Sequence, residues 1–239
     1  SPGGWRELAL AALATGDAAR AFTALAPLAR SGALGTRKYA ELEARVLVAV
    51  IDAAPDGEAL GKLWSGLAKA QRRAPAAIEA YARRAAGFGM VLPAMDVLEG
   101  ALRREWRPAL VAAYGELAGG DLDARLRRVE GWLDTRPGDA VLLTAAGRIA
   151  ARAKLWSKAR QYAERALALA PDAAAWEVFA EIQAGLGHPA EAQRGYRNAL
   201  AMLRGVAIDP APLARLKAPE LAPPALEERD EHGLPRLPG

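Results

Sequence analysis

Apolar residues recur at helical intervals along most of the chain, and no segment keeps the strict alternation of a β-strand. Leu42, Val46 and Val50 follow one helix face, and Leu60, Leu63 and Leu67 follow another, with the turn-forming residues 54–57 (APDG) between them. Ala, Leu and Arg, which favour helices, dominate the composition. The pattern predicts an all-α chain of antiparallel helix pairs.

Small residues return at a fixed interval in the second half of the chain. The residues at these repeated positions are Gly147, Ala159 and Ala166, followed 33 residues later by Ala180, Ala192 and Ala199. A small side chain lets two helices approach closely, so its periodic return indicates one helix–turn–helix unit used twice. A period of about 34 with this pattern is typical of tetratricopeptide (TPR) repeats.

Other positions of the two units fit the same template. Trp176 stands where a large residue packs between paired helices, and Tyr196 marks the second helix of the last unit. Gly187 is expected at a left-handed helix end, where glycine is favoured. Pro171 closes the preceding unit because proline cannot continue a helix.

The template extends less cleanly towards the N-terminus. The predicted units span 4–31, 36–74, 76–106, 108–137, 139–171 and 172–204, within one repeat domain over 1–205. We expect 36–74 to be a degenerate repeat with lengthened helices over 37–53 and 58–73. The expected architecture is a right-handed α-solenoid. The Pro-rich segment 206–239 is expected to be an extended tail.

Composition excludes several kinds of site. The chain has no Cys, which removes thiolate metal sites and Cys nucleophiles, and only two histidines, His188 and His232. No catalytic or phosphate-binding motif is present, so neither catalytic nor metal-ligating residues are assigned. The net charge is +4, but acidic residues are interleaved throughout, so a nucleic-acid partner is not expected.

Three residues are candidates for ligating haem, namely His188, Tyr162 and Tyr196, because haem iron takes an axial His or Tyr. The ordinary interpretation of each is structural. His188 follows Gly187 in a turn, where a lone histidine is usually a surface or capping residue. Tyr162 and Tyr196 share a face expected to pack within or between repeats. No cofactor is therefore assigned, and haem is kept as an alternative.

Residues 155–162 (LWSKARQY) and 168–171 (ALAP) resemble the HemY family of bacterial TPR proteins associated with haem biosynthesis. Further similar stretches are 63–64 before 71–73, 81–83, Trp106 followed by Pro108, Tyr114–Gly115, and 230–235 (DEHGLP). The resemblance implies a bacterial inner-membrane protein with a transmembrane hairpin upstream and a soluble TPR region facing the cytoplasm. It also implies a role in late protohaem synthesis and supplies no catalytic residues.

Three functional hypotheses follow. The leading one is a non-catalytic scaffold that holds partner proteins, such as haem-pathway enzymes, on preformed helices. The second is a haem- or porphyrin-binding carrier or sensor. The third is a generic peptide-binding or self-assembling repeat module. A peptide clamp built from two asparagines is excluded, because Asn198 is the chain's single Asn.

Overall fold

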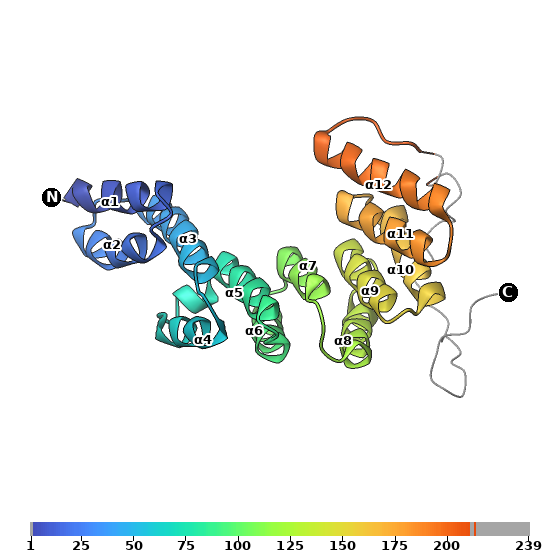
Figure 1. Cartoon of the computed structure of the whole chain (residues 1–239), viewed down its shortest axis with the longest axis horizontal. Helices are drawn as coiled ribbons and strands as arrows, with labels where there is room; N and C mark the ends of the chain where they lie inside the picture. Colours follow the sequence, from blue (N-terminus) through green and yellow to red (C-terminus); the bar gives the residue numbers. More distant parts are fainter. Residues whose placement is uncertain (1, 211–212, 214–239) are drawn as a thin grey trace. The chain divides into compact units, whose positions relative to one another are not determined.

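The computed structural model describes residues 2–210 and residue 213. These residues form twelve α-helices joined by short connections, with one 3-10 turn and no strand (Figure 1). In chain order the helices are α1 (Pro2–Ala14), α2 (Ala18–Ser31), α3 (Thr36–Asp52), α4 (Gly57–Gly66), α5 (Pro75–Gly87), α6 (Val91–Arg104), α7 (Pro108–Glu116), α8 (Leu122–Thr135), α9 (Ala140–Arg152), α10 (Trp156–Leu169), α11 (Ala173–Gly185) and α12 (Pro189–Arg204).

The helices pack in sequential pairs, so the prediction of an all-α chain of helix pairs is confirmed for the described residues. The chain divides into two units, residues 1–113 with 117–119 and residues 114–116 with 120–239. The predicted single repeat domain over 1–205 and its right-handed solenoid stay predictions. No helix in the described part of the chain combines the length and apolar character needed to cross a membrane.

Aspartates begin five of the helices. In each case the Asp side chain accepts a hydrogen bond from the backbone N–H three residues later, which otherwise lacks a partner in the first turn. The capping residues are Asp17 (α2), Asp56 (α4), Asp121 (α8), Asp139 (α9) and Asp172 (α11). Asp139 and Asp172 are 33 residues apart, so the repeat interval also sets where α9 and α11 begin.

The first unit differs from the predicted arrangement of segment 36–74. The structure gives α3 nearly the expected length, but the second helix, α4, ends at Gly66, and a separate 3-10 turn covers Gln71–Arg73. The expectation of a lengthened helix over 58–73 is therefore wrong. Gln71 stabilises the break, because its side chain accepts from Ala68 N (3.0 Å) and donates to Glu43 on α3 (3.0 Å).

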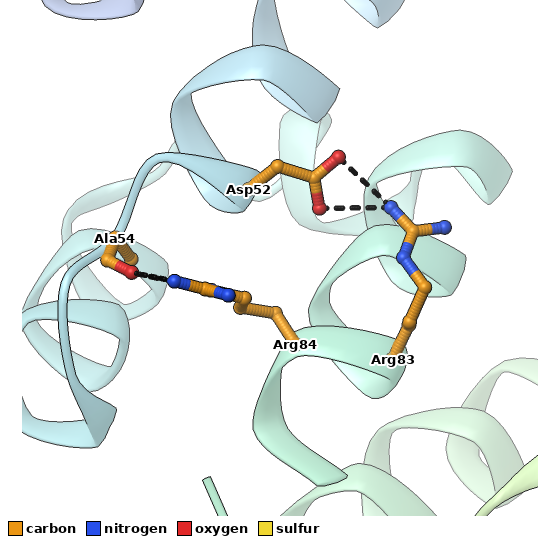
Figure 2. Close-up of polar contacts among 4 residues, drawn as sticks. All are labelled: Asp52, Ala54, Arg83 and Arg84. Atoms are coloured by element: carbon orange, nitrogen blue, oxygen red, sulfur yellow. Dashed lines mark hydrogen bonds and ion pairs between the residues drawn. The ribbon is translucent and has the colours of Figure 1, made fainter. Parts of the chain in front are cut away.

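The main partner of α3 is α5 rather than α4. Two neighbouring arginines of α5 hold the end of α3 (Figure 2). Arg83 Nη2 lies 2.8 and 2.9 Å from the two carboxylate oxygens of Asp52, and Arg84 Nη2 donates to the Ala54 carbonyl at 2.6 Å. Carbonyls at a helix end lack partners within the helix, and cations are favoured there. These contacts therefore fix where α3 ends relative to α5.

The second unit is organised around α9, whose residues 142–151 are all buried. This helix contacts α8, α10 and α11. Gly147 provides the close approach: a Cβ there would lie 3.4 Å from the Ala159 carbonyl oxygen and 3.5 Å from Ala163 N on α10. Three other glycines of this unit lie closer still to a neighbouring helix, one of them Gly185, which lies against the Trp156 ring of α10. A Cβ on Gly115 would be 2.7 Å from Ala145 Cβ, and one on Gly195 would be 2.9 Å from Ala180 Cβ.

The other small residues at repeated positions are also buried in this unit. Ala159, Ala166, Ala180, Ala192 and Ala199 all lie in helix contacts, together with a fully buried Trp176. Pro171 and Gly187 are exposed in the connections, and Gly187 adopts a left-handed φ of +80°.

Asn198 anchors the segment that follows α12. Gly205 ends the helix in a left-handed conformation, after which the chain turns back. Asn198 is only 2% exposed, and its side chain accepts from Asp209 N (2.8 Å) and donates to the Asp209 carbonyl (3.0 Å). The predicted extended tail is thus tied to α12 at residue 209, while residues 211, 212 and 214–239 lie outside the described part of the chain.

The close approach at Gly195 predicts a large effect from a single methyl group. We expect Gly195→Ala to destabilise the chain by about 1–3 kcal/mol through over-packing. Gly147→Leu should act in the same direction. Gly131 is the matched control, because it also lies within a helix but a Cβ there would meet nothing within 4 Å. Gly131→Ala should stabilise by up to about 1 kcal/mol through helix propensity. Thermal melts followed by circular dichroism test this ranking, and the reverse order would contradict it.

A second prediction concerns Lys154, the described non-glycine residue with a positive φ, at 59°. It stands 33 residues before Gly187, at the matching helix end. A side chain in this conformation costs about 1–2 kcal/mol in the folded state, and glycine avoids that cost. Glycine also makes the unfolded chain more flexible, which offsets part of the gain. We expect Lys154→Gly to raise the melting temperature and Gly187→Ala to lower it. A lower melting temperature for Lys154→Gly would show that the lysine side chain makes a compensating contact.

Candidate protein-binding surface

Charged side chains from α9 and α11 meet on one face of the second unit. Arg148 and Arg152 are one turn apart on α9, and Glu177 and Glu181 are one turn apart on α11. Arg148 Nη2 lies 3.0 Å from Glu177 Oε2, so the two helices are joined by an ion pair. Only 10% of the Arg148 side chain is exposed, against 48% for Glu177. The arginine is thus fixed within the unit, while the carboxylate it holds faces solvent.

Arg152 extends this arrangement to the end of α7. Its Nη1 donates to the carbonyls of Gly115 (3.1 Å) and Glu116 (3.0 Å), which are the last two residues of that helix. Arg125 on α8 donates from Nη2 to the preceding carbonyl, that of Tyr114, at 2.6 Å. Two cations therefore satisfy consecutive carbonyls at one helix C-terminus, where the helix dipole favours positive charge.

Burial shifts the pKa values of Arg125 and Arg152. Burial lowers the pKa of Arg125, and its contacts with Tyr114 partly oppose that effect. For Arg152, partial burial of the guanidinium lowers the pKa first and the neighbouring Arg148 lowers it further, while Glu181, Glu116 and Glu177 oppose the shift. The carboxylates of α7 and α11 thus compensate the paired arginines of α9.

Tyr196 on α12 borders the same group of charges. The residue is 42% exposed. Partial burial raises the pKa of Tyr196, and the negative charges of Glu181 and Glu177 raise it further. We call Arg148, Arg152, Glu177, Glu181 and Tyr196 together the charged face. It presents both signs of charge beside an exposed aromatic ring.

The chemistry of the charged face suits recognition of another protein. Arg and Tyr are enriched at energetically important positions of protein interfaces. Among the residues that the structure describes, no group of three or more His, Asp or Glu side chains is arranged to hold a metal ion.

The three haem-ligand candidates lie in different surroundings. His188 is exposed at the start of α12, with Nδ1 2.8 Å from Gln183 Oε1. Tyr162 is buried, and its hydroxyl donates to Glu130 Oε1 at 2.8 Å, an oxygen that Lys158 also binds at 2.8 Å. Tyr196 belongs to the charged face. Within the described residues, no hydrogen bond or ring contact joins these three side chains.

The environment of Tyr162 also opposes the ionised form that iron ligation requires. Burial raises the pKa of its phenol, and the hydrogen bond and negative charge of Glu130 raise it further. The tyrosine and Lys158 instead link α10 to Glu130 on α8. This network is a contact between successive helix pairs of the second unit.

Of the charged face, the sequence pattern singles out Tyr196 alone. Glu177 and Glu181 have the four-residue spacing of one helix face, but that spacing more often marks a solvated face. Arg148 and Arg152 were missed. The available signal was the repeat interval, since Arg148 stands 33 residues before Glu181. Opposite charges at equivalent positions of two adjacent units predict that the charges lie on one face.

Comparison with models of known protein families, with curated proteins and with solved structures found no match.

Proposed function

We propose that this chain is a non-catalytic scaffold that binds partner proteins through helical repeats, with the charged face of α9, α11 and α12 as a contact surface. The observation that carries the proposal is the Arg148–Glu177 pair at 3.0 Å, which fixes a buried arginine under an exposed carboxylate. Charges held in this way need little reordering when a partner binds, which reduces the entropic cost of association.

The proposed partner carries complementary charges of both signs. An acidic group would pair with Arg152, and a basic group would pair with Glu177 or Glu181. Tyr196 supplies an aromatic contact at the edge, where 42% of the residue is open to solvent. Complementary charges of this kind favour specificity and fast association more than raw affinity.

The wider architecture we propose is a right-handed α-solenoid of TPR-like pairs. Sequential helix packing and the 33-residue equivalence of small residues support it. The resemblance to the HemY family is the sole support for a further proposal, that the partners are enzymes of late haem synthesis at the bacterial inner membrane.

Affinity capture with the full chain tests the scaffold proposal. A partner recovered from a bacterial lysate should be identified and its binding reproduced with purified protein. The double variant Glu181→Lys/Tyr196→Ala should then weaken that binding by about tenfold or more, because it reverses one charge and removes the aromatic contact.

Asp134→Lys is the matched control for the charge reversal. Asp134 is an exposed acid in the last turn of α8 and lies outside the charged face. Equal loss of binding in both variants, or capture of no partner above background, would contradict the proposal. A saturable one-to-one shift of the haem Soret band, lost on replacing His188 or Tyr196, would instead favour the carrier or sensor.

A further inference from the structure

A hollow of about 320 Å³ lies between α1 and α3 in the first unit, and nothing in the proposed function uses it. Its apolar lining consists of Leu10 on α1, Leu34 in the connection before α3, and Leu42 on α3. These leucines belong to the N-terminal core or pack against it. The floor of the hollow is therefore supported by the interior of the unit. We call this site the α1–α3 hollow.

The polar lining of the α1–α3 hollow carries an excess of positive charge. Its lining includes Arg6, Lys38 and Arg45 but a single acid, Glu41, and Arg6 is already paired with Glu7 at 3.0 Å. Glu41 is already bound by Arg37, whose Nε lies 3.0 Å from Glu41 Oε1 and which does not line the hollow. The side chains of Lys38 and Arg45 make no hydrogen bond or ion pair with any residue that the structure describes. Two cations beside the leucines thus remain available to an anion.

The helical spacing explains why these groups lie together. Lys38, Leu42 and Arg45 follow one another at intervals of four and three residues, which places them on one face of α3. Arg6 and Leu10 are four residues apart on α1. The two faces meet across the hollow, with leucines inside and cations at the exposed rim.

The shape favours a side chain of a larger molecule over a small ligand. Pockets for small molecules typically measure about 300–1,000 Å³ and bury most of the ligand surface. The α1–α3 hollow is at the lower end of that range, and its rim residues Arg6, Lys38 and Arg45 are all exposed. A ligand seated there would stay open on one side, which suits a side chain whose main chain continues outside.

We propose that the α1–α3 hollow binds an acidic segment of a partner protein. The segment inserts an aliphatic side chain between Leu10, Leu34 and Leu42 and places carboxylates beside Lys38 and Arg45. This inference rests on the proposed scaffold function and gives the chemistry of one of its partner segments. It concerns a different unit from the charged face, so each site can fail separately.

Fluorescence anisotropy with the full chain and a set of short labelled peptides tests the inference. The test peptides carry one Leu, Ile or Phe flanked by Asp and Glu. One control set replaces the apolar residue by Ser, and another replaces the acids by Lys. We expect saturable binding of the acidic apolar peptides alone, weakened by added salt because exposed charges are screened.

Neutralising variants identify the site. Lys38→Gln/Arg45→Gln should weaken peptide binding by about tenfold, since it removes both free cations. Arg20→Gln is the matched control, because Arg20 is exposed on α2 in the same unit and does not line the hollow. It should leave binding within about twofold. Circular dichroism checks that each variant keeps its helical content.

Three results would overturn the inference. The first is that no acidic apolar peptide binds, and the second is that the Ser-substituted peptides bind equally well. The third is that glutarate displaces the peptide with the same affinity as the peptide itself, which would indicate a site for small anions. Partner capture that depends on Glu181 and Tyr196 but not on Lys38 and Arg45 would reject this inference alone. The proposed scaffold function would then still stand.

Discussion

Close approach of helix backbones at positions without a side chain governs how the second unit is built. At Gly115 and Gly195, an added Cβ would lie 2.7 and 2.9 Å from an alanine Cβ of the adjacent helix, closer than such atoms normally pack. A small residue at these positions gives dense packing and many weak dispersion contacts along the helices. The contact of the end of α7 with α9 and that of α12 with α11 depend on this spacing.

The charged face is one consequence of that spacing. Gly115, one of the last residues of α7, packs against Ala145 on α9, and the carbonyls of Gly115 and Glu116 then lie within reach of Arg152. On the other side of α9, a Cβ on Gly147 would lie 3.3 Å from Val178 Cγ1 on α11, and Arg148 next to it reaches Glu177. The polar contacts are therefore set by packing beneath them. A binding surface supported in this way is preorganised.

The sequence allowed the fold class and the helix pairs to be predicted because small residues, turn residues and apolar periodicity agree in the second half of the chain. It misled in segment 36–74, where helix-period leucines continue past Gly66 but the structure ends α4 there and Gln71 ties the chain to Glu43. The left-handed helix end at Gly187 was predictable because glycine favours that conformation. The equivalent left-handed position at Lys154 was not, because lysine gives no such signal. The roles of Gly195 and Arg152 depend on contacts between helices, which neighbouring residues in the sequence do not predict.

The most direct test of the close-approach account is a double-mutant cycle between Gly195 and Ala180. Gly195→Ala would add a methyl group 2.9 Å from Ala180 Cβ, and Ala180→Gly would remove that atom. Unfolding free energies of the wild type, both single variants and the double variant give the coupling. If this contact limits the packing, Ala180→Gly should cost about 1 kcal/mol less in the Gly195→Ala background than in the wild type. Strictly additive effects would show that the Ala180 side chain does not limit the approach of α11 and α12 at Gly195.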